Sequence, residues 1–276
     1  MDGAPETLRG PSHRQIVGLR VDALTYSDAV DLVMGWARAG RSRSVCVATV
    51  HTVMEAHDDP DYRSIVNSAD LVTSDGMPLV WGLRALGLRA AARIYGPDLT
   101  RALLDRSARA GVPVGFYGGS PRVLSQLLSR IGEEFPALMV AYAWSPPFRK
   151  LTVEEEADAV RSIQRSGARI LFVGLGCPKQ ERWMARMRGP VPAVMVGVGA
   201  AFDFIAEVKP QAPAFVQRAG LEWLFRLGTE PRRLWRRYLY HNPRFILLFG
   251  RQLWQERAQD GVEPVPPRRE GIEGSS

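Results

Sequence analysis

The chain has 276 residues, of which 46% are hydrophobic and 24% charged, and its formal net charge is +7. This is an ordinary globular composition, and the length suffices for one large core or two unequal domains. No run approaches the roughly 18 apolar residues that a membrane-spanning helix needs, and the polar N-terminus lacks the apolar segment of a signal peptide. The two cysteines, Cys46 and Cys177, do not indicate a disulfide framework, so we expect a protein of the reducing cytoplasm.

Short apolar runs alternate with amphipathic stretches along most of the chain. In chain order we predict a strand over 16–21, a helix over 27–37 capped by Ser27, a strand over 45–50, helices from about 53 to 58 and over 61–68, and a strand over 69–73. We then predict helices over 77–86 and 96–110, a strand over 112–117, a helix to about 134 and a strand over 138–142. The last predicted elements are a helix to 166 capped by Thr152, a strand from 170, a helix at 180 and a strand over 193–198. The alternation from about 45 to 205 predicts an α/β protein with a doubly wound, mainly parallel, Rossmann-like sheet.

The composition changes along the chain and divides it into four parts. We expect a disordered N-terminus (1–14), an α/β core (15–210), a helical, basic appendage (211–258) and a flexible tail (259–276). From 218 to 251 eight arginines, interleaved with aromatic residues, accompany only two glutamates. Such a segment indicates an anionic partner, either a membrane surface, a nucleic acid or a diphosphate. The alternative is a helical subdomain packed on the core with a solvated basic face.

The segment 170–183 is predicted to be a buried strand, a Gly-Pro turn and a helix start. Ligands bind at the carboxyl ends of parallel strands, and the free N–H groups of a helix start suit a phosphate or diphosphate. The candidate binding residues in this turn are Gly174, Gly176, Pro178, Lys179, Gln180 and Glu181. The turn is no dinucleotide fingerprint, because Lys179 stands where G-x-G-x-x-G requires a third glycine. Gly118 and Gly119 form a similar turn after the strand at 112–117, and an ordinary βα turn is the alternative for both.

Polar residues also follow the strands near 50 and 73. Asp75, in the sequence Ser-Asp-Gly76, is placed to act as a general base toward a hydroxyl group, or else is a turn or N-cap aspartate. Thr49 and His51 are expected at the end of the preceding strand, close to Asp75 in the sheet, where they would orient a sugar hydroxyl or be structural.

Two further charged candidates lie beside glycines. Arg93 precedes a Gly-Pro helix entry and would clamp a phosphate or lie on the surface. Asp203 follows Gly197-Val-Gly199, and it would enter a polar crevice or cap a helix. The four histidines show no metal-ligand spacing, so no metal site is predicted.

Several longer motifs in order resemble those of the WecG/TagA/CpsF family of bacterial glycosyltransferases, glycosyltransferase family 26. They are Asp75-Gly76 after a strand, Arg-x-x-Gly-x-Asp-Leu at 93–99, Gly-Leu-Gly-x-Pro-Lys-Gln-Glu at 174–181, Gly-Val-Gly-x-x-Phe-Asp at 197–203, and Gly-Leu-Glu-Trp-Leu-Phe-Arg-Leu followed by Glu-Pro-Arg-Arg at 220–233. The resemblance covers roughly residues 45 to 250.

The resemblance implies an inverting glycosyl transfer that needs no metal or other cofactor. A UDP-sugar (N-acetylmannosamine, glucose or similar) would be the donor, and a polyprenyl-diphosphate-linked saccharide at the cytoplasmic membrane face the acceptor, in cell-surface polysaccharide biosynthesis. Asp75 matches the family's proposed base, and 174–180 the nucleotide-sugar pocket. The appendage would close over the site at the membrane, and its arginines would bind the negatively charged diphosphate. The candidate arginines are Arg226, Arg232, Arg233, Arg236 and Arg237, and the first choice among them is Arg226, Arg233 and Arg236. The family also suggests a homo-oligomer.

The sequence departs from the family pattern at two places. The family's Thr-x-Asn reads Thr49-Val-His51, so either of these residues could fill the polar position, and its Ala-Gly…Arg-Ala-Pro reads Ala-Glu…Gln-Ala-Pro at 206–213. Three alternatives stay open at this stage: a nucleic-acid-binding protein that uses the basic aromatic segment, a nucleotide-sugar epimerase or dehydrogenase, and a non-catalytic membrane scaffold.

Overall fold

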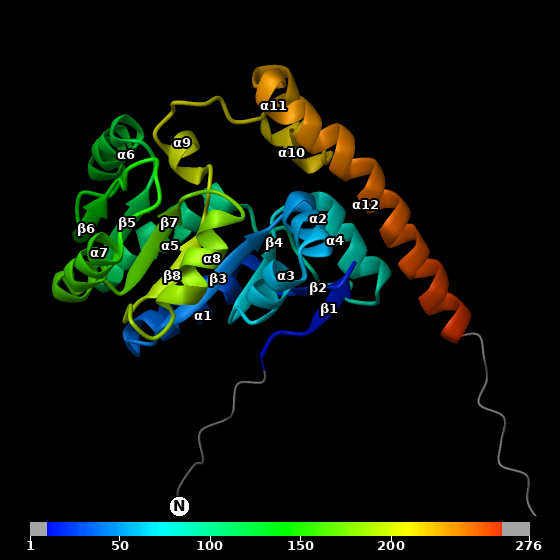
Figure 1. The fold of residues 1–276 in the computed structure, drawn as a ribbon, viewed down its shortest axis with the longest axis horizontal. Coiled ribbons are helices and arrows are strands. Elements are labelled where there is room, and N and C mark those ends of the chain that lie inside the picture. Colours follow the sequence, from blue (N-terminus) through cyan, green and yellow to red (C-terminus); the bar gives the residue numbers. More distant parts are fainter. Residues whose placement is uncertain (1–9, 261–276) are drawn as a thin grey trace, which may run out of the picture.

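A computed structural model describes residues 10–260, and its centre is a six-stranded parallel sheet in the order β4-β3-β8-β7-β5-β6 (Figure 1). These strands are β3 (Arg43–Ala48), β4 (Leu71–Ser74), β5 (Val114–Gly118), β6 (Val140–Trp144), β7 (Ile170–Gly174) and β8 (Val194–Gly197). A separate antiparallel hairpin precedes them, made of β1 (His13–Ile16) and β2 (Leu19–Asp22). The predicted α/β class with a mainly parallel sheet is therefore confirmed.

Helices cover both faces of the sheet, and three more follow it at the C-terminal end. The helices are α1 (Tyr26–Arg38), α2 (Val50–Asp58), α3 (Pro60–Asn67), α4 (Met77–Ala85), α5 (Gly96–Ala110), α6 (Pro121–Glu134), α7 (Val153–Ser166), α8 (Lys179–Met187), α9 (Ala201–Ile205), α10 (Ala214–Arg218), α11 (Glu222–Thr229) and α12 (Pro231–Asp260).

The strands are apolar on both sides, and successive residues belong to different cores. Val45 and Val47 pack with α1, α5 and α6, whereas Cys46 and Ala48 pack with the helices of the opposite face. This alternation follows from the two-residue period of a strand, and burial on both faces is typical of parallel sheets. The strands other than the half-exposed edge strand β6 are therefore buried on both faces, and ligands are expected at the carboxyl edge of the sheet.

Three local predictions were wrong near the N-terminus. The expected strand over 16–21 is a hairpin, because Val17 and Gly18 both adopt positive φ and turn the chain back; it begins at His13, inside the segment expected to be disordered. The first helix is capped by Thr25 and not by Ser27. The Thr25 hydroxyl accepts a hydrogen bond from the Asp28 N–H, and the Asp28 carboxylate accepts one from the Thr25 N–H. Thr49 and His51 do not end a strand, because β3 stops at Ala48 and α2 begins at Val50.

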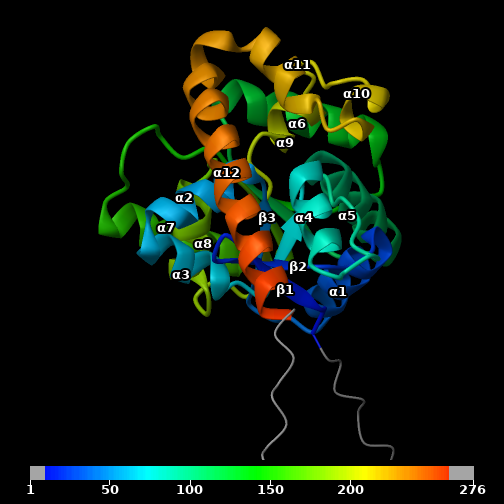
Figure 2. The ribbon, with the colours of Figure 1, turned by 90° about the vertical axis from the view of Figure 1, so that its right-hand side faces the viewer.

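The C-terminal helix α12 runs back along the core beside α2 and the β1–β2 hairpin (Figures 1 and 2). The Gln252 side chain fixes this path, because it accepts a hydrogen bond from the Val17 N–H at 2.8 Å and donates one to the Gln15 carbonyl at 2.7 Å. None of the helices within residues 10–260 is both long enough and apolar enough to cross a bilayer. Most of the predicted flexible tail, 261–276, lies outside the described residues.

Candidate functional site

A cavity of about 660 Å³ lies between the carboxyl ends of β3 and β4 and the C-terminal helices α10 to α12. Its polar end is formed by residues of the core and of the appendage, among them Thr49, His51, Asp75, Gly76, Arg93, Gln217, Glu222, Arg226, Arg237 and His241. Its other end, between α4 and α12, is apolar and includes Trp81, Ala85, Phe245, Phe249 and Leu253. The cavity therefore suits a ligand with a charged head and an apolar part.

Asp75 stands at the centre of the polar end, directly after β4. Its backbone N–H donates to the Ala48 carbonyl at 2.9 Å, which extends the β3–β4 pairing by one residue and fixes the side chain at the sheet edge. Its Oδ1 atom is buried and has no hydrogen-bond partner among the described residues. A carboxylate oxygen held in this way is available to a substrate hydroxyl.

Arg93 joins Asp75 to the appendage. The guanidinium donates to the Asp75 carbonyl and stacks on the Tyr95 ring at 4.2 Å. From the other side it pairs with the Glu222 carboxylate of α11 and donates to the Gln217 Oε1 atom at 3.2 Å. The predicted phosphate clamp is thus engaged in fastening the appendage over Asp75, with its Nη2 atom 3.7 Å from Asp75 Oδ1.

The environment raises the pKa of Asp75 to about 7. Burial is the largest cause, and the negative charge of Glu222 adds to it, while Arg93, Arg226 and the Gly96 N–H act in the opposite direction. A general base works best with a pKa close to the working pH. The surroundings of Asp75 are therefore those of a carboxylate able to take a proton near neutrality.

Two arginines of the appendage line the same cavity as Asp75. Arg226 lies against the Phe204 ring at 5.4 Å, and Arg237 is buried enough that its pKa is lowered, mainly by desolvation. The Nε atoms of both are buried and have no hydrogen-bond partner among residues 10–260. Guanidinium groups with unused donors in a desolvated cavity are suited to a phosphate or diphosphate.

Thr49 and His51 line the cavity from the start of α2. Thr49 caps the helix and exchanges bonds with Thr52, so its hydroxyl is already engaged within the chain. Burial lowers the pKa of His51 to about 3, and Arg237 and His241 act in the same direction, so that its imidazole is neutral at pH 7. Of the two residues proposed for the polar position, His51 is the one in which the described structure shows an unpaired buried nitrogen, Nδ1.

Comparison with known proteins agrees with this arrangement. The family described as "Glycosyl transferase WecG/TagA/CpsF family" matches residues 14–259. The chain belongs to this family. A Bacillus spizizenii protein named N-acetylglucosaminyldiphosphoundecaprenol N-acetyl-beta-D-mannosaminyltransferase is 34% identical to it over 186 residues, which are 67% of this chain and 70% of the relative. The protein is accordingly a glycosyltransferase, and the expected resemblance is confirmed.

The glycine turns of the transferase lie elsewhere on the same sheet edge. Gly118 and Gly174 end the neighbouring strands β5 and β7 and touch each other: a Cβ atom on Gly118 would come within 2.6 Å of the Gly174 backbone. In turn, a Cβ on Gly174 would strike the Phe202 ring at 2.5 Å. The glycines here thus permit close backbone approach.

Several predicted site residues of the transferase do not line the cavity at Asp75. They are Gly118, Gly119, Gly174, Gly176, Pro178, Lys179, Gln180, Glu181 and Asp203. Gln180 is buried, with its Oε1 atom accepting from the Gly176 N–H at 3.1 Å and its Nε2 atom donating to Glu181 at 2.8 Å. Asp203 neither enters the cavity nor caps α9, since its carboxylate lies 3.5 Å from Lys209. Their roles stay a prediction.

The five predicted arginines of the transferase separate into two groups. Arg226 and Arg237 line the cavity, whereas Arg232, Arg233 and Arg236 are exposed outside it, and Arg233 pairs with Glu230 at 2.7 Å. The first choice of Arg226, Arg233 and Arg236 therefore agrees with the cavity at one position only.

Sequence reasoning missed the acidic and amide partners contributed by the appendage. Glu222 and Gln217 were not singled out, although Glu222 falls inside one of the family motifs. His241 was considered only for its sequence spacing, and Glu55 was not considered, yet both lie beside His51. The i,i+4 spacing of His51 and Glu55 would have been the available signal, but the predicted helix began at about residue 53 and left His51 outside it.

Proposed function

We propose that the protein is an inverting, metal-independent glycosyltransferase that moves a sugar from a UDP-sugar to a polyprenyl-diphosphate-linked saccharide. Asp75 takes the proton of the acceptor hydroxyl, and the oxygen of that hydroxyl attacks the anomeric carbon of the donor sugar. The bond from that carbon to the diphosphate oxygen breaks on the opposite face, and UDP leaves with the electron pair. Arg226 and Arg237 stabilise the negative charge of a diphosphate in the cavity, as fixed cations do at a developing charge.

The observation that carries this proposal is Asp75, half-buried with an unpartnered Oδ1 atom, in one cavity with two arginines whose Nε donors are unused. The apolar end of the same cavity supports an acceptor that carries a prenyl chain. The relative's name pairs an N-acetylmannosaminyl group with an N-acetylglucosaminyl-diphosphoundecaprenol acceptor, and it supports N-acetylmannosamine as the first donor sugar to test. Contacts of the 174–180 turn with the nucleotide, and self-association through the core, remain predictions.

The test is UDP release from a panel of UDP-sugars, with and without a polyprenyl-diphosphate-linked N-acetylglucosamine acceptor, each in buffer and in EDTA. We expect release from one donor that depends on the acceptor and whose kcat is unchanged by EDTA. Release without acceptor, or kcat abolished by EDTA and restored by a metal ion, would contradict the proposed mechanism. Salt-sensitive oligonucleotide binding without any turnover would favour the nucleic-acid alternative.

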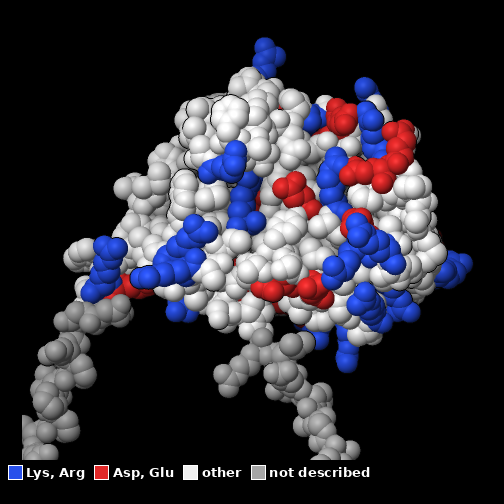
Figure 3. Space-filling model, turned by 180° about the vertical axis from the view of Figure 1, so that it is seen from behind, with Lys and Arg blue, Asp and Glu red and all other residues white. Residues whose placement is uncertain are grey.

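We also propose that the appendage rests on the membrane surface. Large apolar side chains of α11 and α12 are exposed, including Leu224, Trp235, Leu239, Leu247 and Trp254. Figure 3 shows that charged side chains of both signs are scattered over the back of the core, whereas the part toward α11 and α12 carries uncharged areas with mainly Lys and Arg side chains between them. Apolar residues with flanking arginines are typical of helices that lie in a membrane interface.

Replacing two of these side chains is expected to release the protein from lipid. The double substitution Trp235→Ala and Leu239→Ala should weaken binding to anionic phospholipid vesicles by about tenfold or more, since burying one large apolar side chain is worth about 1.5–3 kcal/mol. Co-sedimentation with the vesicles measures the bound fraction of each protein. Phe148→Ala is the control, because Phe148 is 90% exposed in the loop between β6 and α7. Equal loss in both proteins, or in neither, would contradict this membrane surface.

The charge of Glu222 should be visible in the pH dependence of the reaction. Glu222 raises the pKa of Asp75 and shares the guanidinium of Arg93 with it, so Glu222→Gln removes a negative neighbour and leaves Arg93 to Asp75 alone. Both changes lower the pKa of Asp75, and the rising limb of kcat/KM should move to lower pH. Glu207→Gln, which alters a surface ion pair with Arg130, should leave the limb in place. A limb that stays or moves to higher pH in Glu222→Gln would contradict this coupling.

A further inference from the structure

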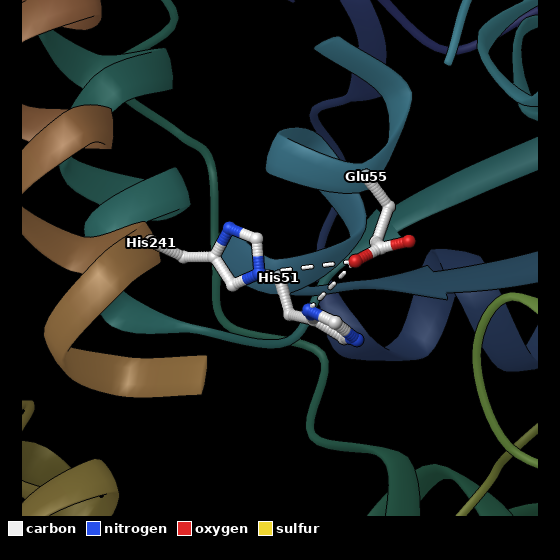
Figure 4. A group of neighbouring side chains, drawn as sticks. All are labelled: His51, Glu55 and His241. Atoms are coloured by element: carbon white, nitrogen blue, oxygen red, sulfur yellow. Dashed lines mark ion pairs between the residues drawn. The ribbon is translucent and has the colours of Figure 1, made fainter. Parts of the chain in front are cut away.

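Two imidazoles and one carboxylate meet where the appendage helix α12 crosses α2 (Figure 4). His51 and Glu55 are four residues apart on α2 and therefore lie on one face of that helix. His241 reaches them from α12. The Glu55 Oε1 atom lies 3.7 Å from His51 Nδ1 and 3.8 Å from His241 Nε2, and the two ring centroids are 5.2 Å apart.

These separations fit ligands around one metal ion better than they fit hydrogen bonds. Hydrogen bonds between nitrogen and oxygen span about 2.7–3.2 Å. Two ligands bound at about 2.0–2.1 Å to a tetrahedral zinc ion lie about 3.4 Å apart, because the angle between the bonds is near that of a tetrahedron. All three side chains offer an atom within 4.8 Å of the other two, and the two separations from the Glu55 oxygen are within a few tenths of an ångström of that ligand-to-ligand separation around zinc.

The neighbouring groups leave these atoms free. His51 Nδ1 is buried without a hydrogen-bond partner, and no side-chain hydrogen bond among residues 10–260 reaches the Glu55 carboxylate. The other acids at the end of α2 are already paired, Asp58 with Arg244 and Asp59 with Arg182. A buried polar atom without a partner is costly, and a bound ion would remove that cost.

The ligand chemistry selects among cations. Two imidazoles and one carboxylate are a set that binds zinc and similar transition metals, whereas magnesium and calcium require mostly oxygen ligands. Arg237 lies close enough to influence both His51 and Glu55, and its charge opposes any cation that is held only by electrostatic attraction. Coordination by imidazole nitrogen tolerates such a neighbour better, which also favours a transition metal.

We propose that His51, Glu55 and His241 bind one divalent transition-metal ion of the zinc class, with water in the remaining position, and that this ion fastens α12 to α2. His51 and His241 also line the cavity, but Arg93 already holds the appendage over Asp75 through Glu222 and Gln217. The ion would therefore add stability to this contact without taking part in the transfer, and its removal should lower the melting temperature and leave kcat unchanged. The proposal does not depend on the donor sugar or on the role of Asp75.

Metal binding is measured on the full chain without any sugar substrate. Protein freed of metal with EDTA and then dialysed is titrated with Zn²⁺ by calorimetry, and with Co²⁺ by the visible spectrum of its coordinated ion. We expect one ion per chain, a rise in melting temperature with Zn²⁺, and slower proteolysis within α11 and α12. Wild-type protein that binds no ion, or binds it without any gain in melting temperature or protection, would overturn the proposal.

Substitutions locate the ion. Glu55→Gln and His241→Gln should each weaken Zn²⁺ binding by more than about 100-fold, since loss of an outer-shell partner alone costs roughly 10- to 100-fold. His57→Gln is the matched control, because His57 lies on the same helix outside the cluster and should leave binding unchanged. Circular dichroism checks that each protein is folded. Unchanged affinity in both cluster variants, or equal loss in His57→Gln, would refute the site, while UDP release in EDTA tests the proposed function separately.

Discussion

Asp75→Asn is expected to lower kcat for acceptor-dependent UDP release by about 100- to 10,000-fold, the range that a positioned general base contributes. The amide has nearly the shape of the carboxylate but cannot accept the proton of the acceptor hydroxyl. Because Asp75 follows the last residue of β4 and its N–H bonds to the Ala48 carbonyl, the backbone should hold its place. Steady-state kinetics with saturating acceptor, together with calorimetric UDP binding, measure the effect.

The same substitution should change the pH dependence. The pKa of Asp75 is raised to about 7, so the wild-type rate should rise as the pH passes through 7 and Asp75 loses its proton. In Asp75→Asn the residual rate should no longer show that limb. Asp105→Asn serves as the control, because Asp105 lies on the surface of α5 in a pair with Arg109. Full activity in Asp75→Asn with intact UDP binding would refute the base assignment.

The sequence predicted the parallel core well because each strand of that core can be recognised from its own residues. Each central strand is a short apolar run bounded by glycine, proline or a capping residue. Such a run is typical of a strand that is buried on both faces, as the strands of a parallel sheet are. The first strand was misread for a local reason too. Val17 occupies a positive-φ turn position that a β-branched residue rarely adopts, so the run from Ile16 to Val21 looked continuous.

The candidate site was predictable one strand end at a time but not as an assembly. Asp75 could be picked out because it follows the parallel strand β4, and Arg93 because it precedes the Gly-Pro start of helix α5. Their partners Glu222 and Gln217 come more than 120 residues later, and only the path of the appendage brings them together. The same holds for His51 and His241, whose spacing along the chain carries no metal signature.

The arginines of the appendage show most clearly what the sequence alone does not predict. Arg236 and Arg237 are adjacent in the sequence and chemically identical, yet a step of one residue turns a helix by about 100 degrees. Arg237 therefore faces the cavity, and Arg236 faces solvent. Which of the eight arginines meets the diphosphate depends on how α12 crosses α2, and no local pattern encodes that crossing.

Arg237→Ala should lower kcat/KM by about 100- to 1,000-fold, the loss seen when one preorganised donor to a developing charge is removed. Arg237 is half-buried at the cavity, its buried Nε atom has no hydrogen-bond partner among residues 10–260, and it lines the same cavity as Asp75. The loss should fall mainly on the rate of acceptor-dependent UDP release. Arg226→Ala should act in the same direction, since its guanidinium has the same free donor.

The control for both substitutions is Arg251→Ala. Arg251 is exposed on helix α12 and does not line the cavity, so its loss should change kcat/KM by less than about threefold and leave the fold stable. Arg233→Ala and Arg236→Ala decide between the two ways of choosing the diphosphate contacts. If either costs more activity than Arg237→Ala, exposure in the absence of substrate does not identify the contacts, and the appendage must rearrange on binding. If both cost less, the cavity defines the diphosphate site, and the membrane remains the natural partner of the arginines outside it.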